Sequence, residues 1–270
     1  MIYKKNFNKL SFLVYGLGST GKSVINFFIK NKIKNYFVWD DYNKNSYLNR
    51  RPHNLAKTLK EVSYIVLSPG VSLKISKHKK KLQKFKNKII TDLDLIYLLR
   101  KDFKTIVVTG TNGKSTTCKI IYHVLKKNKF NVLLGGNFGT PVLQLSPKKT
   151  NFLIIEASSY QLSHSKFIKP DFAVLLNITN DHLDWHGSMR EYVNSKLKIF
   201  RLQTKSQFSI INKKFVNNFK TKKFSGKIII PDKKIYLKFK NQIKNAYVKS
   251  TINDENVSNV LALTKLLKIN

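Results

Sequence analysis

Short apolar runs alternate along this chain with segments that have the apolar spacing of helices. The runs that predict buried strands cover residues 11–15, 36–39, 64–67, 105–109, 132–134, 152–155, 172–176, 206–211 and 227–230. Helical patterns cover residues 22–30, 92–99, 114–127, 189–200 and a last segment that begins at Asp254, the expected N-cap. Strands that alternate with helices form βαβ units, so the pattern predicts an α/β protein with mainly parallel sheets.

The composition narrows the class of protein. Hydrophobic residues make up 42% of the chain, which is enough to build cores and excludes wholesale disorder. The single cysteine, Cys118, excludes an intramolecular disulfide and suits a reducing compartment. The apolar run at residues 10–15 is too short for a membrane span and is unlike a signal peptide. We therefore expect a cytoplasmic protein without membrane insertion.

The charge balance is unusual. Lys and Arg number 51 against 14 Asp and Glu, which gives a net charge of +37. Such a charge is typical of nucleic-acid binding. It also fits compositional drift, since the chain is rich in Asn, Ile, Phe and Tyr, whose codons are AT-rich, and its lysines spread widely apart from seven between residues 77 and 88. We favour solvated lysine faces and expect no specific nucleic-acid partner, although the field would attract anionic substrates.

The strongest local signal is the sequence VVTGTNGKST at residues 107–116. A strand leads into a glycine turn, then Lys114 and Ser115, then a helix. Backbone N–H groups in such a turn converge on a phosphate, and the helix N-terminus adds positive potential. Lys114 is then placed to reach the terminal phosphates and Ser115 to bind Mg²⁺. The longer GxxxxGK[ST] pattern would need a glycine at Val108, so this is a shorter loop.

A second glycine-rich turn follows the first strand. Gly16, Gly18 and Gly21 fit the GxGxxG pattern, and Asp40 ends the next strand. This is the dinucleotide-binding fingerprint, which suggests an NAD-dependent dehydrogenase. A close-packed turn without ligand, or a site for the diphosphate of a nucleotide sugar, would have the same pattern. We favour the last, because an enzyme that joins a UDP-linked substrate to ATP chemistry needs two phosphate sites.

These motifs divide the chain of 270 residues into two units, as its length allows. We predict an N-terminal Rossmann-like parallel-sheet domain at residues 1–103. A P-loop ATPase-like central α/β domain is predicted at residues 104–270.

Further chemistry-bearing residues follow two predicted strands of the second unit. Glu156 ends one of them, where α/β sheets place their ligands, and either holds Mg²⁺ or is a surface carboxylate. After the other strand, Asp181, His182, Asp184 and His186 gather two acids and two histidines within six residues. In a chain so poor in acids, this cluster suggests a second metal or substrate-carboxylate site.

Together these stretches resemble the Mur ligase family, which makes bacterial peptidoglycan precursors. The matching segments are GTNGKST at 110–116, EASSYQL at 156–162, NITNDHLDWHGS at 177–188 and the region of Lys196. The segments GLGSTGKS at 16–23, SPGV at 68–71 and GGNFGTP at 135–141 are most similar to the member that adds D-glutamate to UDP-N-acetylmuramoyl-L-alanine. The resemblance covers nearly the whole chain and is weakest from about 201 to 250.

The resemblance implies roles for individual residues. ATP would contact Gly110, Thr111, Asn112, Gly113, Lys114, Ser115 and Thr116, with Asn256 and Asn259 near its adenine end. Mg²⁺ would be held by Ser115, Glu156, His182 and Lys196, the family's carbamylated lysine. The UDP-linked substrate would contact Ser19, Thr20, Asp40, Gly70 and Asn137. Lys114, His182 and Lys196 would be the catalytic residues. The histidine that usually precedes the first asparagine in the family is Glu255 here.

The implied reaction forms an acyl phosphate from ATP and the L-alanyl carboxylate, and the amine of D-glutamate then displaces phosphate. The family's third, C-terminal domain, which binds the amino acid, is not expected within these 270 residues, and the central domain itself is expected to be clipped. We therefore expect a monomer that is a poor ligase on its own. The alternatives are another Mur ligase or a folylpolyglutamate synthase, a basic nucleic-acid-associated NTPase, and a nicotinamide oxidoreductase that rests on residues 16–21 alone.

Overall fold

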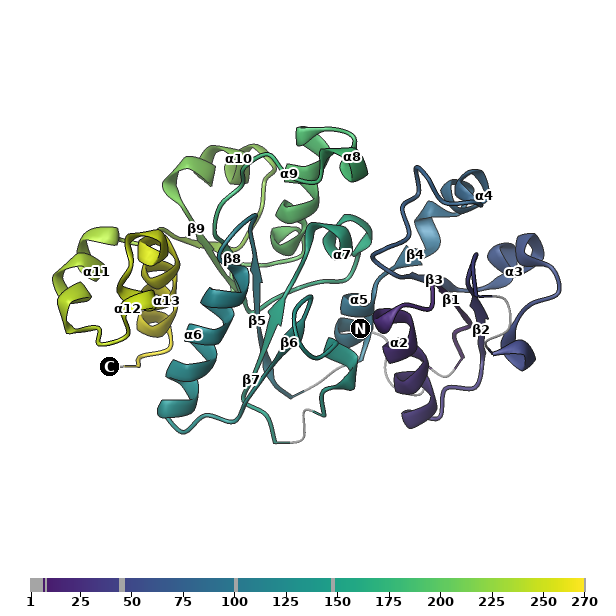
Figure 1. Cartoon of the computed structure of the whole chain (residues 1–270), viewed down its shortest axis with the longest axis horizontal. Helices are drawn as coiled ribbons and strands as arrows, with labels where there is room; N and C mark the ends of the chain where they lie inside the picture. The colour runs from purple at the N-terminus through teal and green to yellow at the C-terminus, as the bar shows by residue number, and fades with distance from the viewer. Residues whose placement is uncertain (1–6, 8, 44–46, 100–101, 147–148, 270) are drawn as a thin grey trace.

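The computed structural model describes residues 7, 9–43, 47–99, 102–146 and 149–269. Two parallel sheets, each flanked by helices, lie side by side (Figure 1). This arrangement confirms the predicted α/β fold class. In the part of the chain that is described, no helix is long and apolar enough to cross a membrane.

The first sheet has the strand order β2-β1-β3-β4, and all of its pairings are parallel. Its strands are β1 (Phe12–Tyr15), β2 (Tyr36–Trp39), β3 (Tyr64–Leu67) and β4 (Ile89–Ile90). Its helices are α2 (Ser19–Lys30), α3 (Leu55–Glu61), α4 (Lys79–Lys84) and α5 (Asp92–Leu98), with 3-10 turns η1 (Leu48–Arg50) and η2 (Lys86–Lys88). Successive residues of β1 alternate between two cores: Phe12 and Val14 pack with α2, and Leu13 and Tyr15 pack with α3.

The second sheet has six parallel strands in the order β10-β9-β8-β5-β7-β6. The strands are β5 (Lys104–Thr109), β6 (Val132–Gly136), β7 (Phe152–Glu156), β8 (Phe172–Leu175), β9 (Phe208–Ile211) and β10 (Lys227–Ile229). Strand β5 lies between β7 and β8. The chain runs outward from β5 to β6, returns through β7 and crosses to β8, so the strand order reverses beside β5. Ligands of α/β proteins bind at the carboxyl ends of strands at such a reversal.

Helices cover both faces of this sheet. The helical elements are α6 (Lys114–Lys127), η3 (Val142–Gln144), α7 (Ser159–His164), α8 (Leu183–His186), α9 (Met189–Leu197), η4 (Lys198–Phe200), η5 (Lys213–Phe215), α10 (Val216–Thr221), α11 (Lys233–Phe239), η6 (Lys240–Gln242), α12 (Ala246–Lys249), η7 (Thr251–Asn253) and α13 (Asp254–Leu266). Ile106 and Val108 of β5 face a core with α6 and α13, whereas Val107 faces the other core, which also holds Ile155. The central strand is therefore apolar on both sides, as a buried parallel strand requires.

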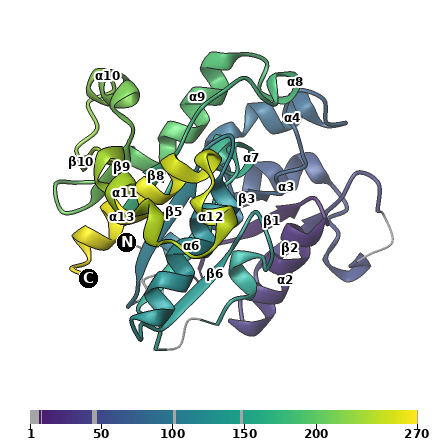
Figure 2. The same cartoon turned by 60° about the vertical axis from the view of Figure 1, so that its left-hand side comes forward.

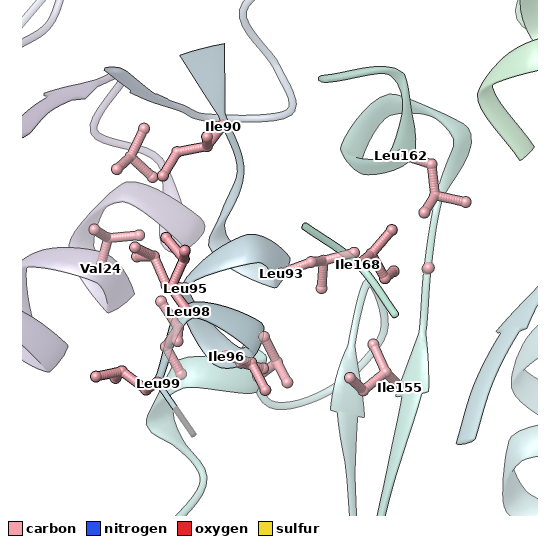
Figure 3. Packing of buried hydrophobic residues seen from close by; sticks show 14 of the residues in the cluster. Val24, Ile90, Leu93, Leu95, Ile96, Leu98, Leu99, Ile155, Leu162 and Ile168 are labelled. Carbon is pink, nitrogen blue, oxygen red and sulfur yellow. The ribbon is translucent and has the colours of Figure 1, made fainter. Parts of the chain in front are cut away.

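The two units share one core, and α5 lies in it. Figure 3 shows Leu95 of α5 beside Val24 of α2, while Leu93 points toward Ile168 of the second unit. These side chains belong to one continuous cluster of buried residues that reaches Ile155 of β7. Packing therefore fixes the two sheets relative to each other.

Two buried carboxylates add polar contacts to this junction. Asp92 accepts hydrogen bonds from Gln161 Nε2 at 3.1 and 3.2 Å. Asp94 Oδ1 accepts from Ser165 Oγ at 2.6 Å and from the backbone nitrogens of Lys166 and Phe167 at 2.9 and 2.8 Å. Because burial outweighs these bonds, the pKa of Asp92 rises to about 6 and that of Asp94 is also raised.

Several local expectations need correction. Asn253, not Asp254, is the N-cap of α13, because Asp254 is the first helical residue and its carboxylate contacts Lys233 and Lys240 at 3.2 and 2.6 Å. The helix expected at residues 189–200 gives way to a 3-10 turn after Leu197. The lysine-rich stretch at residues 77–88 contains α4 and η2. The boundary predicted between residues 103 and 104 falls in the connection from α5 to β5, and we retain it as a proposal.

Candidate active site

The phosphate loop, residues 110–113, joins the central strand β5 to helix α6. Gly113 precedes the helix with a φ of 82°, a left-handed conformation that favours glycine. A Cβ at this position would lie 2.3 Å from Asn256 Oδ1, so glycine is also required by packing. No side chain among the described residues caps the start of α6. Its first N–H groups are therefore left to bind an anion at the loop.

A second loop braces the phosphate loop from the end of β8. Asn177 Oδ1 accepts a hydrogen bond from the Asn112 nitrogen at 2.9 Å, and the Asn177 carbonyl accepts one from the Thr111 nitrogen at 2.9 Å. The Thr179 nitrogen donates to Thr111 Oγ1 at 3.0 Å. No role was predicted for Asn177 from the sequence. Its position directly after the predicted strand at residues 172–176 could have indicated it.

Two lysines converge on one carbonyl of the loop. Lys114 Nζ and Lys196 Nζ donate to the Gly110 oxygen at 3.1 and 2.7 Å. Lys196 is 1% exposed, and its Nζ lies 4.5 Å from the centre of the Tyr192 ring. Burial, and then the charge of Lys114, lower the pKa of Lys196 from 10.5 to about 7. Much of Lys196 is therefore the neutral amine near neutral pH.

Lys114 itself is half-buried and also donates to the Thr111 carbonyl at 2.7 Å. Burial lowers its pKa, against the attraction of Glu156 and Asp181. Tyr192 completes this side of the loop, because its hydroxyl lies 2.9 Å from Thr111 Oγ1. Tyr192 lies four residues before Lys196 on α9, and that helical spacing could have indicated it from the sequence.

Glu156 lies at the carboxyl end of β7, directly opposite the start of α6. It is 3% exposed, so the alternative of a surface carboxylate was wrong. Ser115 Oγ donates to Glu156 Oε2 at 2.8 Å, and Asn137 Nδ2 donates to Oε1 at 3.1 Å. Gly136 allows this approach, since a Cβ there would lie 2.2 Å from the Glu156 carbonyl oxygen. Three residues far apart in sequence thus meet beside the phosphate loop.

The two histidines after β8 have different environments. His182 has a φ of 52°, pairs its Nδ1 with Asp181 at 3.2 Å and lies with its ring centre 4.7 Å from that of Tyr160. His186 is buried and bonds Ser159 Oγ through Nε2 at 3.0 Å. Burial and nearby cations lower the pKa of His186 to about 4, so it is a neutral packing residue. Within the described ranges, no three His, Cys, Asp or Glu side chains gather as a metal site, so the four-residue cluster does not form one by itself; its alternative, a site for a substrate carboxylate, stays a prediction.

The two asparagines of the last helix are both buried, but they differ in their contacts and hydrogen bonds. Asn256 packs against Gly113 and donates through Nδ2 to Asn253 Oδ1 at 3.0 Å. Asn259 donates through Nδ2 to the Glu255 carbonyl at 2.7 Å, while its Oδ1 is buried without a partner in the described part of the chain. The structure thus brings Asn256 to the phosphate loop, and leaves Asn259 one unused acceptor.

The glycine-rich turn of the first sheet is closely packed. A Cβ on Gly21 would lie 1.9 Å from the Gly16 carbonyl oxygen. Asp40 Oδ2 accepts from the Leu17 nitrogen at 2.7 Å, and Oδ1 accepts from the nitrogens of Tyr42 and Asn43 at 2.9 and 2.8 Å. Asp40 therefore organises the loops around this turn.

The remaining predicted substrate residues lie at the same edge of this sheet. Ser19 and Thr20 begin α2 after β1, Gly70 follows β3, and Asp40 follows β2. The carboxyl ends of parallel neighbours meet at one edge, so these positions form one rim. Gly70 is exposed, and a Cβ there would meet nothing within 4 Å.

The fold and the loop first define a class: an α/β protein with a P-loop-type turn at the central strand of its second sheet. The sequence profile described as the Mur ligase middle domain matches residues 108–266, which is more than half of the chain. The chain belongs to the Mur ligase family, and the resemblance inferred from the motifs is confirmed.

Individual relatives support this family assignment. The UDP-N-acetylmuramoylalanine--D-glutamate ligase of Wolbachia pipientis wMel is 40% identical over 69% of this chain. The protein of the same description from the Wolbachia of Brugia malayi is 33% identical over 96% of this chain. The chain spans 38% and 66% of the lengths of these two relatives. The crystal structure of MurF ligase from Thermotoga maritima in complex with ADP has a TM-score of 0.51 and 16% identity, and covers 100% of this chain and 64% of its own; this likeness concerns the fold alone.

Proposed function

We propose that this chain is the ATP- and UDP-substrate-binding core of a ligase that adds D-glutamate to UDP-N-acetylmuramoyl-L-alanine. The observation that carries the proposal is the meeting of Lys114, Ser115, Glu156 and Lys196 around one phosphate loop. Two relatives of this chain, 40% and 33% identical to it, are described as UDP-N-acetylmuramoylalanine--D-glutamate ligases. The free, buried thiol of Cys118 fits an enzyme of the cytoplasm, and we propose a monomer.

The phosphate side of the site would bind ATP through residues 110–116. The uncapped start of α6 offers N–H groups, and Lys114 offers an ammonium that bonds loop carbonyls until phosphate displaces them. Positive charge at this point stabilises the charge that spreads over a phosphoryl group in transfer. Asn256 and Asn259 would approach the adenine end, where the unused Oδ1 of Asn259 can accept an amino hydrogen.

The donor set fits Mg²⁺. Ser115 Oγ and Glu156 are oxygen donors in contact with each other, and their small number suits a cation that takes its remaining ligands from phosphates and water. Ser115 and Glu156 would hold one ion and His182 and Lys196 a second, and bound Mg²⁺ would neutralise phosphate charge. Asn137 orients Glu156 through its amide, which leaves the second carboxylate oxygen to Ser115.

Lys196 would act as a carbamate. Its neutral Nζ attacks the carbon of CO₂, the N–C bond forms, and one proton leaves to solvent. The product carries negative charge, which replaces the repulsion from Lys114 by attraction and favours a nearby cation. An amine whose pKa lies near 7 is present in the reactive form at physiological pH, whereas an ordinary lysine is not.

The remaining steps depend on how the substrate would be positioned. The N-terminal rim of Ser19, Thr20, Asp40 and Gly70 would hold the UDP end of the substrate, and Asn137 the muramoyl part. The L-alanyl carboxylate then attacks the γ-phosphate, the bond to ADP breaks, and the amine of D-glutamate displaces phosphate from the acyl phosphate. Because the shared core fixes both sheets, the two ends of the substrate are held at a set distance, which contributes through orientation.

The first half-reaction provides the test. The chain is incubated with Mg-ATP, UDP-N-acetylmuramoyl-L-alanine and hydroxylamine, which traps an acyl phosphate as a hydroxamate. We expect substrate-dependent hydroxamate and ADP with the wild type, and a loss of at least tenfold with Lys114→Ala. Absence of ATP binding by calorimetry, or equal binding by the variant, would refute the nucleotide site.

A further inference from the structure

Tyr247 lies far from the phosphate loop in sequence but contacts it in space. Its hydroxyl lies 3.1 Å from Oγ1 of Thr116, in the first turn of α6, across 131 residues. Figure 2 shows α12, which carries Tyr247, in front of α6. No role was predicted for Tyr247 from the sequence, because this residue falls in the stretch where the resemblance to the family is weakest.

The tyrosine backbone is held as firmly as its hydroxyl. Asn253 Nδ2 donates to the Tyr247 carbonyl at 2.7 Å, and Asn253 Oδ1 accepts from Asn256 Nδ2 at 3.0 Å. Asn256 packs on Gly113 of the phosphate loop. Contacts therefore run from Gly113 through both asparagines to Tyr247, and from the Tyr247 hydroxyl back to Thr116. The ring is fixed relative to the loop at both of its ends.

Stability does not account for this arrangement. The Tyr247 residue is 62% exposed, so its ring buries little apolar area, and one exposed hydrogen bond adds little to folding. An aromatic ring fixed in place yet left open to solvent is suited to a ligand with a flat, apolar face. The first turn of α6, where Thr116 lies, is where the sugar and base of a nucleotide would leave a triphosphate bound at residues 110–115.

We propose that Tyr247 is a nucleotide-positioning residue whose ring receives the face of the purine base of bound ATP. This inference rests on the proposed function, which supplies the triphosphate. Every base has a π-face, and aromatic side chains stack on it. The hydroxyl bond to Thr116 sets the ring's distance from the phosphates, so the base and the triphosphate are held by one connected unit.

A comparison of two ligands separates the base from the phosphates. Calorimetry with Mg²⁺ measures the dissociation constants of ATP and of inorganic tripolyphosphate, which has no base. For Tyr247→Leu we expect ATP affinity to fall by about 5- to 100-fold, and tripolyphosphate affinity to stay within twofold. For Tyr247→Phe, which keeps the ring, ATP affinity should stay within about threefold. Ile252→Ala is the matched control, since Ile252 is 83% exposed in the same segment, and it should change neither constant.

The outcomes are decisive. Unchanged ATP affinity in Tyr247→Leu would overturn the inference, and so would an equal loss for both ligands, because the ring would then act by shaping the phosphate loop. If the wild type bound neither ligand, the proposed nucleotide site would fail and this inference with it. If the wild type bound ATP and tripolyphosphate with the same dissociation constant, the base would add nothing to binding. The phosphate site would then stand, and only the role of Tyr247 would be refuted.

Discussion

Replacing Asp92 by asparagine tests the buried junction between the two sheets. The Asp92 carboxylate is 1% exposed, and among the described residues the Gln161 amide is its one side-chain donor. Burial raises its pKa from 3.8 to about 6. The folded state therefore holds this proton more tightly than the unfolded chain. The protonated Asp92 therefore makes its full contribution to stability below pH 3.8. This contribution is lost as pH rises through 6, and the loss totals ~3 kcal/mol.

Asparagine keeps the size of Asp92 and one acceptor for Gln161 but carries no charge. Urea unfolding at several pH values measures the free energy of unfolding of both Asp92→Asn and the wild type. At each pH the wild-type value is subtracted from that of the variant. This difference should rise by ~2 kcal/mol from pH 4.5 to 7.5, and most of the rise should be complete by about pH 6.5. A difference that stays constant over this range would refute the account of a charge buried in the junction.

Asp94→Asn provides the matched comparison in the same helix. The Asp94 Oδ1 atom accepts from Ser165, Lys166 and Phe167, while Oδ2 accepts from the Thr91 nitrogen at 2.9 Å. An asparagine amide would turn an N–H donor toward that nitrogen. We expect a loss of ~1–3 kcal/mol at pH 7.5, because a buried N–H is left without an acceptor. Wild-type stability of this variant would show that the bond is dispensable.

The other predictions concern the phosphate loop. Gly113→Ala forces a Cβ to 2.3 Å from Asn256 Oδ1 at a left-handed φ, so ATP affinity should fall more than tenfold and stability by ~1–3 kcal/mol, measured by calorimetry and urea unfolding. Glu156→Gln should weaken ATP binding in the presence of Mg²⁺ but not in EDTA, and equal effects in both would contradict the metal assignment. With ¹³C-bicarbonate, a carbamate resonance should increase as pH rises through 7 and be absent in Lys196→Met; an unchanged spectrum in the variant would exclude Lys196 as its source.

Strands β3, β5, β7 and β8 could be predicted closely because each is a short apolar run that is buried along nearly its whole length. Strands β2 and β3 have the predicted bounds, and β5 differs by one residue. The loop residues Lys114 and Ser115 were evident for a related reason, since backbone geometry demands glycine and a helix start at fixed spacing. Short helices such as α7 and α12 span only four to six residues, too few to give a periodic signal.

Long-range polar contacts explain most of what the sequence did not reveal. The pairing of Asp254 with Lys233 and Lys240 depends on where α11 packs, which local pattern does not encode. Glu156 is buried against Ser115, which lies 41 residues away along the chain, and the pKa of Lys196 is lowered by burial and by the charge of Lys114. Such environments follow from the tertiary fold; its position at a strand end indicated Glu156 beforehand, whereas only the family resemblance indicated Lys196.

The position of α5 has a consequence for the way the molecule can be divided. Its leucines are covered on one side by the first unit and on the other by the second. Cutting the chain between α5 and β5 would leave a strip of apolar side chains bare on both pieces, and each piece would be prone to self-association. The two sheets should therefore unfold together in a single thermal transition. This is expected although the first sheet has its own glycine-rich turn and the second its own phosphate loop, as two independent domains would.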